Sequence, residues 1–221
     1  MQTFSIAEEL FDVCPDAKLG CIFFTATVEK KNNSLWTFIE SYIRQSVAPN
    51  LTMEAILQAQ HIRDSRALYK SLGKEPNRYR ISSEALLLRI LKGKGLYQIN
   101  NIVDINNLIS LKTLYSVGSY DLDRLGENIV FRIGQPGEFF KGIGKDVINV
   151  EHLPVFADES GAYGSPTSDS EKAMIRMEST NMVIILISFS GDEIDFTDSV
   201  QYLEQYTNAT NIRTVVVKKD Q

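Results

Sequence analysis

The chain has 221 residues, of which 43% are hydrophobic and 23% charged, an ordinary composition for a globular protein with a buried core. This length predicts one domain over residues 1–221 that needs no disulfide or metal for stability. The net charge of −5 argues against a protein that binds nucleic acid over its whole surface. The longest strongly apolar stretch, residues 182–187, is too short to cross a membrane.

The cysteines and the N-terminus bear on the cellular compartment. Cys14 and Cys21 have no histidine nearby, which predicts two reduced thiols and not a zinc site. Glu8 and Glu9 come early, and no basic segment precedes an apolar run, which argues against a signal peptide. We therefore expect a cytoplasmic protein with no membrane partner, no metal and no cofactor.

The first half of the chain combines one strand with a series of helices. β-Branched and aromatic residues predict a strand from Gly20 to Val28. Apolar residues at helical spacing then predict four helices. Their expected limits are Ser34 to Pro49, Thr52 to Leu68, Ser82 or Ser83 to Leu91, and a fourth helix that begins at Asn100 or Asn101.

Strands dominate the chain after Leu114. The expected strands are Asn128–Ile133, Val147–Val150, Val155–Ala157 and Met182–Phe189, followed by a helix over Thr197–Tyr206 and a strand over Arg213–Val217. This order predicts an α+β fold, a single domain in which N-terminal helices pack on mixed or antiparallel sheets.

One face of the fourth helix carries short polar side chains. Asp104, Asn107 and Ser110 recur at three-residue spacing and therefore share a face, while apolar residues occupy another. Side chains of this kind suit the binding of an amino acid or a ribose. The alternative is a capping and packing role, with Asp104 favoured near the helix start by the macrodipole.

The segment Val117–Asp121, which we expect to be a loop, follows that helix. Gly118 permits a close approach of a ligand to the backbone, and free N–H groups beside it can polarise an ester carbonyl. The alternative is an ordinary turn ahead of a strand.

A basic region precedes both features. Residues 63–94 hold nine basic and three acidic side chains, a net charge of +6. Arginine binds phosphates and stacks on bases, and tyrosine adds stacking surface, so this region predicts contact with RNA. The alternative is a solvated helical surface. The expected RNA-binding residues are Arg66, Tyr69, Arg78 and Arg80.

The order of these motifs resembles the tRNA-binding and editing module of the phenylalanyl-tRNA synthetase beta subunit. The matching segments are Val103–Asn107, Val117–Asp123, Val130–Arg132, Gly137–Glu138 and Ala157–Asp158, within a resemblance that covers about Arg66 to Phe189. One departure concerns the chemistry. The family has a histidine eleven positions after the asparagine of the first motif, and this chain has Gly118 there.

The resemblance implies specific roles. Asn107 falls on the sequence position of an asparagine that lines the family's editing pocket. Glu171 falls near the sequence position of a glutamate that, in the family, holds the amino group of the bound amino acid. The expected catalytic residues are Asn107, Gly118 and Ser119, and the expected substrate-binding residues are Asp104, Asn106, Ser110, Tyr120 and Glu171. His61 and His152 match no catalytic position of the family.

Three functions remain open at this point. The first is a free-standing editing deacylase that hydrolyses mischarged aminoacyl-tRNA by water attack on the 3′ ester, and not a complete tRNA ligase. The second is a non-catalytic module that binds a tRNA end or an amino acid and has lost the chemistry. The third is a hydrolase of an unrelated small ester or amide. The expected partner in the first two is the acceptor end of a tRNA, or aminoacyl-tRNA.

Overall fold

Two four-stranded sheets and a layer of helices form the body of the protein. The computed structural model describes residues 2–144 and 146–219. The first sheet has the order β10-β2-β9-β3 and is antiparallel throughout. Its strands are β2 (Lys18–Thr25), β3 (Ser116–Asp121), β9 (Asn181–Ser188) and β10 (Thr210–Val217).

The second sheet is mixed and has the order β1-β4-β7-β8, with only β1 and β4 parallel. Its strands are β1 (Thr3–Ile6), β4 (Asn128–Ile133), β7 (Pro154–Asp158) and β8 (Gly161–Gly164). A separate hairpin joins β5 (Phe139–Lys141) to β6 (Val147–Asn149). The predicted α+β class with mixed and antiparallel sheets is therefore confirmed.

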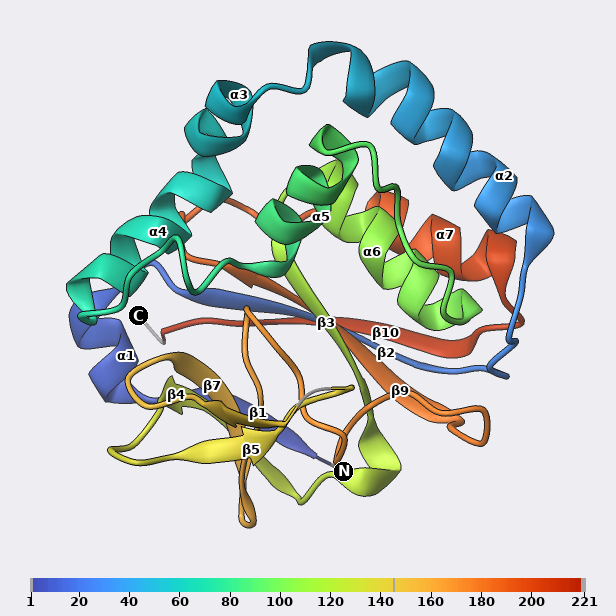
Figure 1. The fold of residues 1–221 in the computed structure, drawn as a ribbon. Coiled ribbons are helices and arrows are strands. Elements are labelled where there is room, and N and C mark those ends of the chain that lie inside the picture. The colour runs from blue at the N-terminus through green and yellow to red at the C-terminus, as the bar shows by residue number, and fades with distance from the viewer. Residues whose placement is uncertain (1, 145, 220–221) are drawn as a thin grey trace.

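Most helices gather on one face of the first sheet, whereas α1 (Glu8–Val13) packs against β4 of the second sheet (Figure 1). The other α-helices are α2 (Asn33–Tyr42), α3 (Met53–Gln58), α4 (Gln60–Ser71), α5 (Ser82–Leu91), α6 (Asn101–Thr113) and α7 (Thr197–Tyr206). In Figure 1, α2, α3 and α4 form an arch around α5, α6 and α7, while the second sheet lies on the opposite side of the first.

The buried residues of β9 show why its sequence is continuously apolar. Ile184 and Leu186 pack against α2, α6 and α7, while Val183, Ile185 and Ile187 pack between the two sheets. Because both faces of this strand are covered, neither needs polar residues. β3 has the same two faces, so Val117 points towards the helices and Tyr120 towards the second sheet.

The helix starts agree only in part with the sequence predictions. Asn100 caps α6 by accepting a hydrogen bond from Val103 N–H at 2.9 Å, and Thr52 caps α3 in the same way, as expected. Asn32, and not Ser34, caps α2. The side chains of Ser82 and Ser83 cap nothing, since α5 begins without a side-chain cap.

Two predicted elements are wrong. The single helix expected over Thr52–Leu68 is divided into α3 and α4 because Ala59 has an extended ψ of 127°. The expected loop over Val117–Asp121 is strand β3 instead, hydrogen-bonded to β9 over its whole length. This second correction changes the geometry available at Gly118.

Candidate functional site

β3 lies at the edge of its sheet, so only one of its sides pairs with another strand. On the open side, Val117 N–H donates to Ser82 Oγ at 3.0 Å and Asp121 N–H donates to the Ala173 carbonyl at 3.0 Å. Backbone groups alternate in direction along a strand, so the N–H and C=O of Ser119 also point to this side. No residue that the structure describes forms a hydrogen bond with either group. The edge is therefore closed at both ends and open at Ser119.

α6 brings two asparagines to this opening. Ser110 Oγ lies 3.4 Å from Ser82 Oγ, at one closed end of the edge. Asn106 lies one helical turn earlier on the same face, and α6 runs antiparallel to β3, so we infer from this spacing that Asn106 lies near Ser119. Asn106 is 7% exposed, and its Nδ2 donates to Asn107 Oδ1 at 3.5 Å.

The Asn106 side chain is only partly satisfied. Its Oδ1 is buried and has no hydrogen-bond partner within the described part of the chain. A buried acceptor without a donor destabilises the folded protein by about 1–3 kcal/mol, so it indicates a place for a ligand that donates a hydrogen bond. The neighbouring Asn107 is half-buried.

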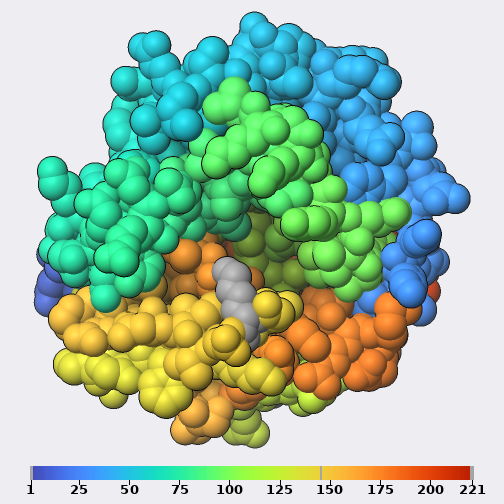
Figure 2. Space-filling view, in the orientation of Figure 1, coloured from blue at the N-terminus to red at the C-terminus, as the bar shows by residue number. Residues whose placement is uncertain are grey.

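The molecular surface is hollowed at this place. Figure 2 shows a depression whose upper rim is formed by the green atoms of α5 and α6 and whose lower rim is formed by yellow and orange atoms of later segments. Atoms with the olive colour of the β3 region lie at its floor. The hollow therefore lies between the helices and the later segments, over the region of β3.

Gly118 lies on the opposite face of β3 from this opening, beneath Tyr120. A Cβ atom at Gly118 would lie 2.5 Å from the Tyr120 hydroxyl oxygen, and one at Gly164 would lie 2.6 Å from the same atom. The Tyr120 hydroxyl donates to Asp169 Oδ1 at 2.7 Å, and burial raises the pKa of Tyr120 well above its usual value. The tyrosine ring thus occupies the space that a side chain at position 118 would need, and its hydroxyl stays neutral.

Asp104 and Ser110 are engaged inside the protein. Asp104 accepts hydrogen bonds from Trp36 Nε1 at 2.6 Å and from Ile99 N–H at 3.0 Å. Ser110 is fully buried, and its hydroxyl donates to the Tyr115 carbonyl at 2.8 Å. These contacts hold the start of α6 and the turn into β3, which is the capping and packing role that the sequence left open.

Glu171 already has a cationic partner. Its carboxylate lies 2.9 Å from Lys141 Nζ, and its N–H donates to the Lys141 carbonyl at 3.1 Å. The structure therefore places Glu171 in an ion pair beside β5, and it shows no contact between Glu171 and the asparagines of α6.

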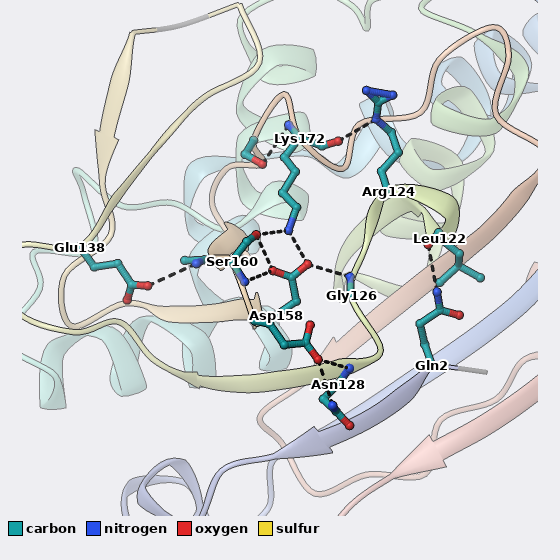
Figure 3. A network of polar contacts seen from close by, with 12 residues as sticks. Gln2, Leu122, Arg124, Gly126, Asn128, Glu138, Asp158, Ser160 and Lys172 are labelled. Atoms are coloured by element: carbon teal, nitrogen blue, oxygen red, sulfur yellow. Dashed lines mark hydrogen bonds and ion pairs between the residues drawn. The ribbon is translucent and has the colours of Figure 1, made fainter.

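A polar network anchors the segment that closes the β3 edge at Ala173. Asp158 accepts hydrogen bonds from Lys172 Nζ, from Gly126 N–H at 2.9 Å and from Ser160 Oγ at 2.8 Å (Figure 3). Burial of Asp158 opposes ionisation, but these hydrogen bonds outweigh it and lower the pKa of the carboxyl to about 2. The carboxylate thereby ties three separate segments together.

The predicted basic cluster is partly neutralised. Arg66 and Arg80 share one buried carboxylate, Glu84, at 2.9 and 3.4 Å, whereas Arg78 is exposed. Tyr69 is 1% exposed, so its ring has no free face for a base. Of the four predicted RNA-binding residues, the structure leaves Arg78 and Arg80 at the surface and Arg66 half-buried.

The two histidines lie outside the opening at Ser119. The His61 ring packs at a tilt of 35° against Tyr115 with ring centroids 4.1 Å apart, and its Nδ1 lies 3.1 Å from Ser190 Oγ. Burial lowers the pKa of His61 in spite of the nearby Asp192, so its imidazole is neutral at pH 7. His152 is exposed on a turn with a positive φ of 58°.

The described part of the chain offers neither a metal site nor a membrane-spanning helix. Within residues 2–144 and 146–219, no group of three or more His, Cys, Asp or Glu side chains is arranged to hold a metal ion. No helix in the same part of the chain is long and apolar enough to span a bilayer. Cys14 and Cys21 are both buried free thiols.

Sequence reasoning missed two residues that shape the site. Ser82 was expected only as a helix cap, but its Oγ closes one end of the β3 edge at Val117. Asp169 belongs to a charged, serine-rich segment that resembles a solvated loop, but it accepts the hydrogen bond from Tyr120. Both contacts join residues more than thirty positions apart, so no local signal could have indicated them.

Comparison with known proteins identifies relatives. A family described as the B3/4 domain matches residues 64–216. The phenylalanine–tRNA ligase beta subunit of Geobacter metallireducens is 30% identical over 115 residues, which cover 51% of this chain and 14% of that protein. The corresponding subunit of Fusobacterium nucleatum is 26% identical over 139 residues, 58% of this chain and 17% of that protein.

A solved N-terminal fragment of the phenylalanyl-tRNA synthetase beta subunit from Pyrococcus horikoshii also matches. The match has 12% identity and a TM-score of 0.47, and it covers 98% of this chain and 54% of that fragment. The chain spans about a sixth or less of the two curated relatives, which are 14% and 17% covered. The family and sequence matches confirm the resemblance to the synthetase beta subunit.

Proposed function

The chain belongs to the B3/4 domain family, and from this premise we propose that it hydrolyses mischarged aminoacyl-tRNA in trans, in the cytoplasm. The observation that carries the proposal is the open edge of β3 at Ser119, together with the unpaired Asn106 Oδ1 that helix geometry places on the same side of α6. Two relatives that match this chain are named phenylalanine–tRNA ligase beta subunit, which supports an aminoacyl-tRNA as the substrate.

The open edge offers a donor for the ester carbonyl. The Ser119 N–H points out of the sheet without a partner among the described residues, so it can donate to the carbonyl oxygen as negative charge develops there. Asn107, the neighbour of Asn106 on α6, is half-buried and would orient the attacking water. Water oxygen bonds to the carbonyl carbon, the bond from that carbon to the ribose oxygen breaks, and the ribose oxygen takes up the proton that the water loses.

Asn106 would hold the amino group of the aminoacyl ester. An ammonium group has three N–H donors and needs acceptors, and the unpaired Asn106 Oδ1 is such an acceptor. The Ser119 carbonyl, which also points to the open side, would accept a second hydrogen bond. This pair takes over the role that the resemblance assigned to Glu171, whose carboxylate is bound by Lys141.

Catalysis at this place depends on orientation and not on a strong base. Tyr120 occupies the space beside Gly118, and its phenol is neutral. Positioned reactants and fixed dipoles can still lower the barrier by several kcal/mol. The terminal hydroxyl of the tRNA would assist the water. The same lack of a base at position 118 favours a second candidate, a module that binds the tRNA end without hydrolysis.

The basic surface would hold the acceptor end of the tRNA. Arg78 and Arg80 are exposed and can reach phosphates, whereas Arg66 is half-buried and bound to Glu84. Tyr69 is not part of this surface because its ring is buried.

Hydrolysis of a panel of correctly and wrongly charged tRNAs tests the proposal. The wild-type chain should deacylate one mischarged species selectively, and Asn107→Ala should slow this reaction about 100-fold because the water loses its orientation. Asn33→Ala is the matched control, since it removes an exposed asparagine side chain at the start of α2. Uniform inactivity together with salt-sensitive tRNA binding would support the binding module and contradict the deacylase.

A further inference from the structure

The connection between α5 and α6 carries an exposed tyrosine that is held in place from one side. Tyr97 is 64% exposed, and the Arg89 guanidinium carbon lies 3.9 Å from the centre of its ring. Arg89 Nε also donates to the Gly95 carbonyl at 3.1 Å, so the arginine is fixed between the helix and the connection. A large aromatic ring is thus presented to solvent with one face covered by a cation.

The backbone of this connection has a specified shape. Gly93 and Gly95 have φ values of +68° and +60°, a region that favours glycine. The two glycines therefore set the direction of Lys92 and Lys94, both of which are exposed. The connection is built to hold its side chains in a defined arrangement.

Four cations surround a shallow depression next to Tyr97. The depression has a volume of about 220 Å³ and is lined by Arg80, Ala85, Leu88, Arg89, Lys92 and Lys94. In the described parts of the chain, Arg89, Lys92 and Lys94 form no ion pair, in contrast to Arg66, which is bound to Glu84. Three of the four cations around this depression are therefore free to bind an anion, and only Arg80 shares the Glu84 carboxylate.

We infer that this surface, defined by Arg80, Arg89, Lys92, Lys94 and Tyr97, binds single-stranded RNA, with a base stacked on Tyr97 and phosphates held by the cations. Single-strand binding proteins combine these two elements, because every base has a face to stack and every nucleotide has a phosphate. A lysine-rich surface without a ring would suit any anion. The braced and exposed tyrosine is the element that favours a nucleic acid.

The position of the surface suits the acceptor end of a tRNA. In Figure 1 the connection from α5 to α6 runs along the near side of α6, and in Figure 2 green atoms of this region border the hollow over β3. Identifying the RNA as a tRNA end rests on the proposed function. The surface itself can be tested by binding alone.

Fluorescence anisotropy with a labelled single-stranded RNA of the acceptor-end sequence tests this inference. Tyr97→Ala should weaken binding about five-fold or more, while Tyr97→Phe should bind like the wild type because it keeps the ring. Phe139→Ala is the matched control, since Phe139 is 63% exposed on β5. Lys92→Gln/Lys94→Gln should reduce the slope of log affinity against log salt by about 0.7 per lysine. Lys30→Gln/Lys31→Gln removes the same charge elsewhere.

The inference is overturned if Tyr97→Ala binds like Phe139→Ala, or if the two lysine pairs have equal effects. Binding to phosphatidylserine vesicles in place of RNA would also overturn it. Hydrolysis of mischarged tRNA, measured in parallel, separates this inference from the proposed function. If the RNA binds as expected but no mischarged tRNA is hydrolysed, only the proposed deacylase function is contradicted. If mischarged tRNA is hydrolysed but RNA binding does not depend on Tyr97, only the proposed RNA-binding surface is contradicted.

Discussion

Replacement of Gly118 by alanine tests why this chain has glycine where the resembling family has histidine. The added methyl carbon would lie 2.5 Å from the Tyr120 hydroxyl oxygen and 2.8 Å from Cζ, both closer than carbon atoms in proteins tolerate. The ring has little room to move, because its hydroxyl also fills the space beside Gly164, and Phe156 and Tyr163 pack edge-on with ring centroids 5.7 and 5.3 Å away.

The expected cost follows from overpacking of a buried site. Inserting a methyl group into a close-packed core typically lowers the free energy of unfolding by about 1–3 kcal/mol. Because Tyr120 has no free space into which it can move, we expect a loss of about 2 kcal/mol for Gly118→Ala. For a chain of this length such a loss lowers the melting temperature by about 4–8 °C. Urea and thermal unfolding measure it. Ser119→Ala serves as the control, because it lies on the same strand with its side chain on the other face.

A double-mutant cycle with Tyr120→Phe identifies the atom responsible. Tyr120→Phe removes the nearest oxygen but also the 2.7 Å hydrogen bond to Asp169, so it is destabilising alone. In the Tyr120→Phe variant, Gly118→Ala should lower the free energy of unfolding by at least about 0.5 kcal/mol less than it does in the wild type. A Gly118→Ala variant as stable as the wild type, or strictly additive costs, would refute the steric explanation.

Three further predictions concern stability and reactivity. The pKa of Asp158 falls from 3.8 to about 2 on folding, so its contribution of about 2 kcal/mol is present above pH 4 and is lost as the pH falls towards 2. Acid titration of the unfolding free energy should show this loss in the wild type and not in Asp158→Asn. Burial raises the pKa of Cys14 to about 11 and of Cys21 to about 12, so a thiol reagent at pH 8 should react with either only on unfolding, and a fast reaction of the native protein would be contrary evidence. Arg132 binds Glu138 through two hydrogen bonds at 2.8 and 2.7 Å, so Arg132→Lys should lose about 1–2 kcal/mol in urea unfolding although it keeps the charge, and an unchanged midpoint would contradict this.

Elements with local signals could be predicted from the sequence. α7 begins and ends as expected at Thr197 and Tyr206, and α6 begins at the asparagine cap that its sequence indicates. The apolar run of β9 was also recognisable, because a strand covered on both faces needs no alternation. The basic region and the asparagines of α6 were identified from residue type alone.

The structure of β3 could not be predicted from local sequence. Gly118, Ser119 and Asp121 have low strand propensity, so the segment resembles a loop. Its pairing with β9, more than sixty positions away, decides its conformation. Burial of Tyr69 and the pairing of Arg66 with Glu84 depend on long-range packing as well. The exposed Tyr97 had no distinguishing pattern, because one tyrosine in a glycine-rich connection indicates nothing by itself.

The central claim is that the open edge of β3 at Ser119 receives the acyl group of an aminoacyl-tRNA. NMR observation of the backbone amides tests it most directly, with a non-hydrolysable aminoacyl-adenosine in which an amide replaces the ester. The Ser119 amide should shift and become protected from solvent exchange, whereas those of Val117 and Asp121 should change little, since Ser82 and Ala173 already bind them. An unperturbed Ser119 amide, with the shifts clustered away from α6 and β3, would contradict the account.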